Sequence, residues 1–229
     1  MRSIFHPATA EEAVKLRHEI DGSAYLAGGT EIMRLGSSIS SETALIDVSK
    51  LPLSGIREDE GAVVIGALTT LEEIRTSELV PDFIREAAAA AASLQLRNAA
   101  TIGGNFALRR SDSFMIPALL SSQADVTIMC TKGLRRKSAA EYFGKTECRA
   151  LLMSFIIEKG RNGIYRRIGR SSHSHAAVSG AVSNGYYAYA VSGSGIAFGD
   201  KKDIWNEIDF RDDLTGSADY KRYLASVLL

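Results

Sequence analysis

The chain has 229 residues, of which 45% are hydrophobic and 24% are charged, and this is the composition of an ordinary globular protein. Its 27 Lys and Arg residues balance its 27 Asp and Glu residues, so the overall charge favours neither nucleic acid nor anionic lipid as a partner. An anionic ligand must therefore be held by local geometry. The length allows one large domain or two small ones.

The N-terminal segment and the cysteine content bear on location and metal chemistry. Residues 1–14 lack the apolar core of a signal peptide, and no apolar run, including the alanine run Ala87–Ala92, reaches the roughly 18 residues of a membrane span. We therefore expect a cytoplasmic protein. The only cysteines, Cys130 and Cys148, match no metal or disulfide spacing, so this chain could not hold an iron–sulfur cluster by itself.

The first fifty or so residues predict a small β–α–β layer that ends near residue 54. Thr9 and Glu12 have the spacing of a capping box, and Thr30 is a suitable N-cap for a short helical turn. The elements expected here are a helix at Ala10–Ile20, a strand at Ala24–Ala27, a helical turn at Glu31–Leu35 and a strand at Ala44–Val48.

Strands and helices continue to alternate along the rest of the chain. A turn at Asp59-Glu60-Gly61 predicts a hairpin, Thr70 and Glu73 form a second capping box, and Pro81 suits the first turn of a longer helix. Further strands are expected at Asp125–Cys130, Leu151–Ile157, Ala176–Val182, Tyr186–Ser192 and Gly195–Phe198, and helices at Phe114–Leu120 and Ser217–Leu228. The last helix places Tyr220, Tyr223, Leu224, Val227 and Leu228 on one apolar stripe. The class is α+β or α/β.

Two glycine-centred segments are candidate ligand sites. Gly28-Gly29-Thr30 follows a predicted strand, and glycines there allow positive φ and close approach of the backbone to a ligand. Successive N–H groups at such a turn suit a diphosphate, although the spacing fits neither a Rossmann fingerprint nor a P-loop. Thr101–Asn105, with Gly103 and Gly104, offers a second set of exposed N–H groups. Taken alone, each segment favours a plain turn over a phosphate site, and the second could also be a bulge where backbones pack closely.

Taken together, Leu26–Met33 (LAGGTEIM) and Gln95–Asn105 (QLRNAATIGGN) resemble the FAD-binding subunit or domain of molybdenum hydroxylases, a family that includes xanthine dehydrogenase, aldehyde oxidase and aerobic carbon monoxide dehydrogenase. The resemblance extends over nearly the whole chain. Smaller agreements lie at Ile65–Leu71, Ser111-Asp112, Tyr165–Arg170, Asp212-Asp213 and Gly216–Tyr220.

The resemblance implies an α+β fold in which a two-subdomain FAD-binding domain is followed by a small C-terminal α+β domain. The expected boundaries are 1–160 for the FAD-binding domain, with subdomains of about 1–54 and 55–160, and 161–229 for a shortened C-terminal domain. FAD would lie between the two subdomains.

The resemblance also implies which residues contact FAD. The first cradle around the diphosphate would be formed by Tyr25, Leu26, Ala27, Gly28, Gly29, Thr30, Glu31 and Ile32, and the second by Thr101, Gly104 and Asn105, with Ala100 lining the pocket. Ser111 and Asp112 match positions that face the flavin end, Leu152 one beside the isoalloxazine, and Arg166 one where relatives place a basic side chain that would stabilise reduced, anionic flavin.

The chain departs from the family pattern just before Ser111, where relatives usually carry small residues and a proline. Here Leu108-Arg109-Arg110 stands in a shorter loop. Two arginines near the cofactor could pair with phosphates or with a nicotinamide dinucleotide. They could equally form a solvated loop tip, which is the interpretation we favour from sequence.

The implied function is electron transfer without a catalytic acid or base on this chain. Electrons from a molybdenum centre and 2Fe-2S clusters on partner subunits, a molybdenum-binding large subunit and an iron–sulfur small subunit, would reach FAD and leave to an acceptor such as NAD. The alternatives are a stand-alone flavin oxidoreductase on a related fold and a degenerate scaffold subunit without flavin.

Other motifs favour structural roles. His173 and His175 lack a third metal ligand nearby and predict a polar loop. Ser192–Gly195 is only loosely similar to a nucleophile elbow and predicts a turn between strands. Trp205 is expected to pack, and the basic run Arg135–Lys137 is expected to be surface preceding a helix.

Overall fold

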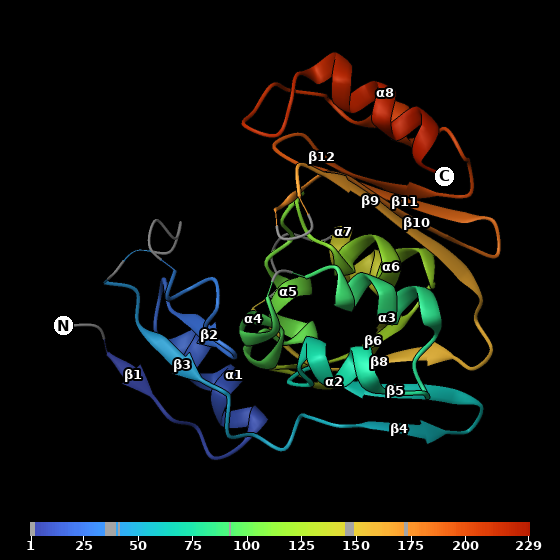
Figure 1. Cartoon of the computed structure of the whole chain (residues 1–229). Coiled ribbons are helices and arrows are strands. Elements are labelled where there is room, and N and C mark those ends of the chain that lie inside the picture. Colours follow the sequence, from blue (N-terminus) through green and yellow to red (C-terminus); the bar gives the residue numbers. More distant parts are fainter. Residues whose placement is uncertain (1–2, 35–39, 41, 92, 145–148, 172–173) are drawn as a thin grey trace.

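The chain forms three β-sheets, each built from a different part of the sequence (Figure 1). The computed structural model describes residues 3–34, 40, 42–91, 93–144, 149–171 and 174–229. Both helix and strand are abundant, and this confirms the predicted α+β class. No helix of the described part of the chain is long and apolar enough to cross a membrane.

The first sheet is parallel and is covered by one helix, α1 (Ala10–Glu19). Its strands lie in the order β1 (Ile4–Phe5), β3 (Leu45–Asp47) and β2 (Ala24–Leu26). The Thr9 hydroxyl accepts the N–H of Glu12 at 3.2 Å, while the Glu12 carboxylate accepts the N–H of Ala8 at 2.7 Å. The predicted helix and strands are therefore confirmed within a residue or two.

The helical turn predicted from Glu31 is confirmed for the residues that the structure describes there. Gly29 adopts φ +70°, and its carbonyl accepts the N–H of Met33 at 2.9 Å, the hydrogen bond of one helical turn. The chain makes this turn at residues 30–33. Leu35, the last residue of the prediction, lies outside the described residues.

The second sheet is antiparallel and has five strands. They lie in the order β4 (Ile56–Asp59), β5 (Ala62–Gly66), β8 (Leu151–Glu158), β6 (Asp125–Cys130) and β7 (Gly133–Ser138). Glu60 and Gly61 both have positive φ, as the predicted hairpin between β4 and β5 requires. Strand β7 was missed because its sequence, GLRRKS, lacks an alternating apolar pattern; β7 is a mostly exposed edge strand.

Six helices accompany this sheet. They are α2 (Leu71–Thr76), α3 (Asp82–Ala89), α4 (Leu94–Ala99), α5 (Ile102–Ala107), α6 (Met115–Ser121) and α7 (Ala139–Gly144). The Thr70 and Glu73 capping box of α2 is confirmed, with both reciprocal hydrogen bonds present. Helix α4 was not predicted, and it has no buried residue that would produce an apolar pattern.

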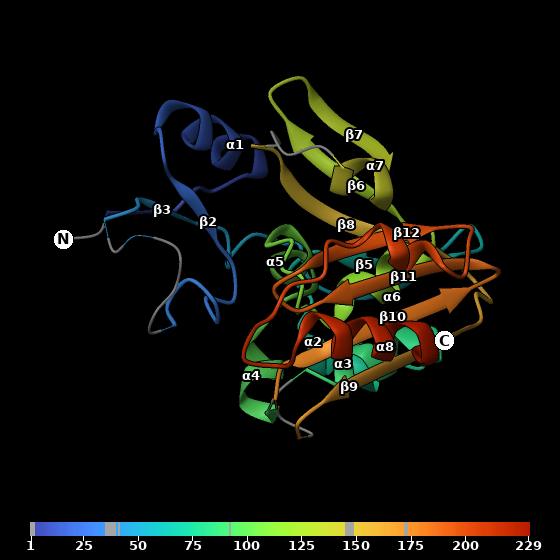
Figure 2. The ribbon, with the colours of Figure 1, turned by 90° about the horizontal axis from the view of Figure 1, so that it is seen from above.

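The third sheet is also antiparallel, and it is formed by the C-terminal part of the chain. Its strands lie in the order β12 (Gly195–Gly199), β11 (Tyr186–Val191), β10 (Ala176–Ser183) and β9 (Gly163–Gly169). The short 3₁₀ helix Ile204–Glu207 and helix α8 (Ala218–Leu228) cover its outer face. Figure 1 thus shows the order sheet, helices, sheet and helix, and Figure 2, seen from above, shows α8 in front of the third sheet.

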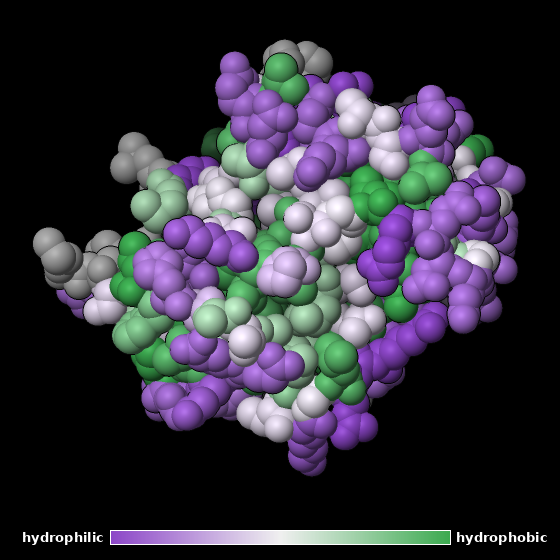
Figure 3. Space-filling model, turned by 90° about the horizontal axis from the view of Figure 1, so that it is seen from below, coloured by the Kyte–Doolittle hydropathy of each residue, from purple (hydrophilic) through white to green (hydrophobic). Residues whose placement is uncertain are grey.

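The main hydrophobic core fills the space between the second and third sheets. Phe106 of α5 packs edge-on against Phe155 of β8, with ring centroids 5.3 Å apart, and Tyr165 and Ala181 of the third sheet belong to the same core. The domain boundaries near residues 54 and 160 stay a prediction. On the face shown in Figure 3, apolar and polar residues alternate in patches.

Helix α8 differs from its predicted apolar stripe. Leu224 is buried as expected, but Tyr223 and Val227 are 63% and 57% exposed. The fully buried residue on the inner face is Lys221, whose Nζ donates to the carbonyls of Ser192 and Arg211 and pairs with Asp213 at 2.7 Å. The stripe was wrong because a charged side chain with three acceptors can be buried where an apolar one was expected.

The acceptors of Lys221 hold the end of β11 to the loop before α8. Burial raises the pKa of the Asp213 carboxyl, but hydrogen bonds from Lys221 and Thr215 outweigh it and hold that pKa well below its usual range. Ser192 donates to the same carboxylate at 2.8 Å. Residues 192–194 form a turn between β11 and β12, as predicted, and Trp205 packs edge-on against Phe210.

We predict that Lys221→Met lowers the free energy of unfolding by about 3 kcal/mol, because it leaves two carbonyls without this donor and the Asp213 carboxylate without its cationic partner. Urea unfolding of the two proteins measures the difference. The exposed Lys201→Met is the matched control and should change stability little. A loss for Lys221→Met below about 1 kcal/mol would contradict the prediction.

Candidate functional site

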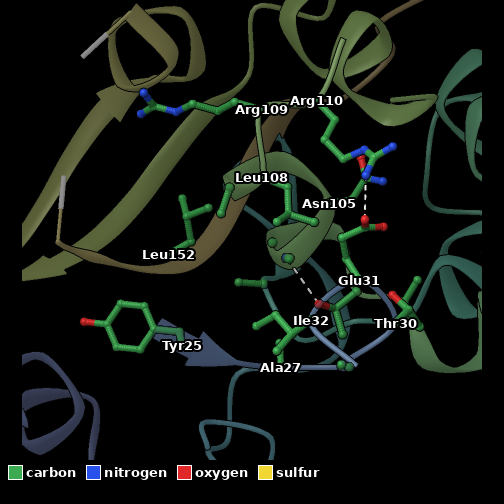
Figure 4. A pocket seen from close by; sticks show the side chains of 18 of the residues that line it. Tyr25, Ala27, Thr30, Glu31, Ile32, Asn105, Leu108, Arg109, Arg110 and Leu152 are labelled. Carbon is green, nitrogen blue, oxygen red and sulfur yellow. Dashed lines mark hydrogen bonds and ion pairs between the residues drawn. The ribbon is translucent and has the colours of Figure 1, made fainter. Parts of the chain in front are cut away.

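A cavity of about 450 Å³ lies where the first and second sheets meet, within the usual range for ligand pockets. It brings together thirteen of the sixteen residues predicted to contact the cofactor. These are Tyr25, Ala27, Gly28, Gly29, Thr30, Glu31, Ile32, Ala100, Thr101, Gly104, Asn105, Asp112 and Leu152. Residues about seventy positions apart in the sequence therefore share one cavity (Figure 4).

The two glycine segments touch at Gly28. A Cβ at this position would lie 1.7 Å from the carbonyl oxygen of Ala99 and 2.7 Å from its carbonyl carbon. A backbone carbonyl cannot move aside without moving its chain, so no other residue fits here. Gly28 thus allows the loop after β2 to pack directly on the end of α4, and this contact closes one side of the cavity.

The first glycine segment has backbone donors that the protein does not use. Within the described residues, the N–H groups of Gly28, Gly29 and Thr30 have no protein acceptor. Gly29 has φ +70° and lies beside the side chains of Leu26 and Met33. Three consecutive unused donors on a cavity wall suit an anionic group such as a diphosphate.

The second glycine segment differs from our expectation of exposed N–H groups. It forms the first turn of α5, and the amides of Ile102, Gly103 and Gly104 are already bonded within the protein. Gly103 donates to the carbonyl of Ala67 at 2.9 Å, and Gly104 donates to the Thr101 hydroxyl at 3.2 Å. The glycines serve packing instead, because a Cβ at Gly103 would lie 2.7 Å from Ala67.

Charged side chains meet on the wall opposite Thr30. Arg110 donates two hydrogen bonds to Asp112, at 2.8 and 2.6 Å, and a third to Glu31 of the first segment. Burial raises the pKa of Asp112, but its bonds and charge interaction with Arg110, together with His175, lower it overall. Hydrogen bonding to Asp112 raises the pKa of Arg110. The Asp112 carboxylate and the Arg110 guanidinium are therefore both charged at neutral pH.

The loop with Arg109 and Arg110 is not the solvated tip that we favoured from sequence. The two side chains point in different directions (Figure 4). Arg109 lies over the rings of Tyr142 and Phe143, 5.4 and 5.7 Å from their centroids, and donates to the Tyr142 carbonyl. Both arginines line the cavity because the short loop is held on one side by a carboxylate pair and on the other by aromatic rings.

Three predicted residues do not line the cavity. Leu26 and Ser111 each lie next to residues that do. Arg166 is exposed, and its guanidinium donates to the carbonyl of Tyr165. Its neighbour Arg167 lies 4.9 Å from the ring centroid of Phe114, which does line the cavity.

Sequence reasoning missed several cavity residues. Arg17, Tyr142 and His175 line it, and the His175 Nδ1 lies 3.2 Å from Asp112. The only signal for His175 was its polarity within a loop. His173, the other half of the weighed metal pair, lies outside the described residues. Tyr25 lines the cavity and donates its hydroxyl to the Arg149 carbonyl at 2.9 Å.

Helix α4 is fixed to α2 by a partly buried ion-pair cluster. Glu72 accepts hydrogen bonds from Arg75 at 2.9 Å and from Arg97 at 2.7 Å. These bonds lower the pKa of Glu72 from its ordinary value of 4.5 to about 2. Arg97 lies two residues before Ala99, so this cluster holds the carbonyl against which Gly28 packs.

The fold and the cavity define an α+β protein with a glycine-lined site for an anionic ligand between two of its sheets. Residues 1–159 match the family model described as "FAD binding domain in molybdopterin dehydrogenase". The chain therefore belongs to this family of FAD-binding domains, and it is a subunit of an oxidoreductase with FAD as its cofactor.

Curated relatives and solved structures agree with this assignment. The chain is 28% identical to "Uncharacterized protein YgfM" of Escherichia coli K12 over 100% of its own length and 94% of that protein. It is 31% identical to the "Nicotinate dehydrogenase FAD-subunit" of Eubacterium barkeri, over 61% of this chain and 49% of that protein. A carbon monoxide dehydrogenase structure from Hydrogenophaga pseudoflava shares the fold, with a TM-score of 0.84, 23% identity and coverage of 98% and 93%.

The residues present fit FAD. Three unused N–H groups face a cavity whose other wall carries Leu108, Leu152 and the Tyr25 ring, so anionic and apolar parts of a flavin dinucleotide both find suitable surfaces. A Cβ at Gly104 would lie 2.9 Å from the Thr101 hydroxyl and 3.9 Å from Ala27, so this glycine keeps the space between the two segments open.

We predict that Gly28→Ala lowers the unfolding free energy by about 1–3 kcal/mol and abolishes FAD binding, because the methyl group forces the first segment away from Ala99. Thermal unfolding and the flavin-to-protein absorbance ratio measure the two effects. Gly144→Ala is the control, since no atom lies within 4 Å of its added Cβ. A Gly28→Ala protein that keeps both its stability and its bound flavin would contradict this prediction.

We predict that Glu72→Gln destabilises the protein at neutral pH. A lowered folded-state pKa contributes stability that is complete above the unfolded value of 4.5 and is lost as the pH falls toward about 2. The stability gap between parent and variant should therefore shrink across this window, as measured by urea unfolding at several pH values. The exposed Glu78→Gln is the control, and a gap independent of pH would contradict the assignment.

Proposed function

We propose that this chain is the FAD-binding electron-transfer subunit of a multi-subunit molybdenum hydroxylase. The observation that carries the proposal is the row of unused donors at Gly28, Gly29 and Thr30, on the wall of a cavity shared with the second glycine segment. It stands together with the family match over residues 1–159.

The names of similar proteins support a division of labour among chains. Besides the nicotinate dehydrogenase FAD-subunit, the chain is 36% identical over 107 residues to the "Carbon monoxide dehydrogenase medium chain" of Hydrogenophaga pseudoflava. Two cysteines in the sequence are too few for the four thiolates of a 2Fe-2S cluster. In this proposal, a molybdenum-binding large subunit and an iron–sulfur small subunit complete the enzyme.

The protein supplies binding and orientation in this proposal. FAD, when bound, accepts single electrons and releases pairs of electrons, with NAD as a proposed acceptor. The N–H groups of Gly28–Thr30 hold the diphosphate, and each bond to the charged group contributes roughly 1.5–3 kcal/mol. Leu152 and Tyr25 flank the flavin. The proposed domain division at about 160 and the cytoplasmic location accompany this function.

A scaffold subunit without flavin is the second candidate, and one observation favours it. The carboxylate of Glu31 lies directly after the open donors and is bonded to Arg110, where it repels an incoming anion unless it moves. A stand-alone flavin oxidoreductase has no comparable observation in its favour.

We predict that the purified chain is yellow, or becomes so with FAD, with flavin bands near about 370 and 450 nm. Gly104→Asp should lose these bands, because it places a carboxylate between the glycine segments, and Gly29→Asp should lose them because it puts a negative charge among the open donors. Gly104→Ala, which adds bulk without charge, is the control and should lose less. If the folded parent chain does not bind FAD, even with its partner subunits, the result would support the scaffold role instead.

A further inference from the structure

The two glycine segments contribute unequally to binding an anion. The first has three unused backbone N–H groups, whereas the amides of Ile102, Gly103 and Gly104 are bonded to Thr69, Ala67 and Thr101. The second wall therefore offers fewer backbone donors to the diphosphate of FAD, and a side-chain donor there would add to them. Arg110 stands on that wall, one hydrogen bond away from the residue that follows Thr30.

Asp112 fixes the direction of the Arg110 guanidinium. The Arg110 Nε and Nη2 groups bond to the two oxygens of Asp112 at 2.8 and 2.6 Å. This bidentate arrangement leaves Nη1 as the nitrogen of Arg110 that can bond across the cavity. The Asp112 side chain is only 14% exposed, so the anchor is well shielded from water.

Glu31 accepts a hydrogen bond from Nη1 of Arg110, but Arg110 is not its only cationic partner. The same oxygen, Oε1, also accepts from Arg34 Nε at 2.9 Å and from Arg34 Nη2 at 2.6 Å. If Arg110 turned to another anion, Glu31 would keep a cationic partner. A carboxylate oxygen and a phosphate oxygen present the same kind of acceptor to a guanidinium group.

We propose that Arg110 is a ligand of the FAD diphosphate and that Glu31 holds its place in the cofactor-free protein. On binding, a phosphate oxygen replaces the Glu31 carboxylate on Nη1, Asp112 keeps its two bonds, and Glu31 remains paired with Arg34. This inference rests on the proposed function and adds a binding residue at a position where the chain departs from its relatives.

The charges explain why the exchange favours the cofactor. A diphosphate carries more negative charge than one carboxylate, and the Arg110 side chain is 34% exposed, so part of its interaction is shielded from water and salt. Arg109 does not compete for this role in the structure, because its guanidinium lies over Tyr142 and bonds to that residue's carbonyl.

The test is the dissociation constant for FAD, measured by titrating the cofactor-free full chain and following flavin fluorescence. Arg110→Met should weaken FAD binding by about tenfold to a hundredfold, the effect of losing one charged hydrogen bond. Arg110→Lys, which keeps the charge but loses the fork, should fall between. Arg57→Met on the exposed part of β4 is the matched control, and thermal unfolding checks that each variant is folded.

The Glu31→Gln variant distinguishes two roles for Glu31. In one, Glu31 is an acceptor that the phosphate replaces; in the other, its ion pair with Arg110 is needed to close the site. If Glu31 only holds the place of the phosphate, this variant binds FAD as tightly as the parent or more tightly. Loss of affinity equal to that of Arg110→Met would show that the ion pair is needed to close the site, and it would overturn the inference. Unchanged affinity in folded Arg110→Met would overturn it as well, while leaving the FAD function intact. A parent chain that does not bind FAD would overturn both proposals.

Discussion

The contact between Gly28 and the Ala99 carbonyl is the constraint on which the site depends. The loop after β2 extends from the first sheet, whereas α4 packs beside the second. The backbones of the loop and of the end of α4 meet with no room for a side chain. On one side, Gly29 then takes positive φ and leaves three amides unused. On the other side, the Ala100 carbonyl accepts the N–H of Leu71 at 2.9 Å, which ties the end of α4 to the start of α2.

A chain of ion pairs joins the three parts of the molecule beside this contact. His175 lies between β9 and β10 of the third sheet, Asp112 and Arg110 belong to the second part, and Glu31 belongs to the first. Asp112, Arg110 and Glu31 are only partly exposed, so their interactions are less screened than those of surface pairs, whereas the His175 side chain is 58% exposed. The positive and negative side chains at the cavity are therefore nearly balanced. An anionic cofactor can take the place of a carboxylate that is already paired with a cation more readily than it can add a negative charge that has no partner.

The accuracy of the sequence predictions follows from how local each signal is. The capping box at Thr70 and the hairpin around Gly61 were confirmed, because a cap or a turn depends on residues three or four apart. Helix α4 and strand β7 were missed, since an exposed element carries no apolar period. The apolar stripe on α8 was wrong at Tyr223 and Val227, which are exposed, while Lys221 is buried on the inner face by three acceptors from residues up to 29 positions away in the chain.

The sequence by itself determined the fold class, the FAD-binding family and thirteen of the residues that line the cavity, because these are carried by short motifs. Only the tertiary structure decided which glycine segment has unused amides and which cation stands on the opposite wall. The pairing of Gly103 with Ala67 and of Arg110 with Glu31 joins residues 36 and 79 positions apart. No local pattern encodes such pairings, since they arise when separate sheets pack together.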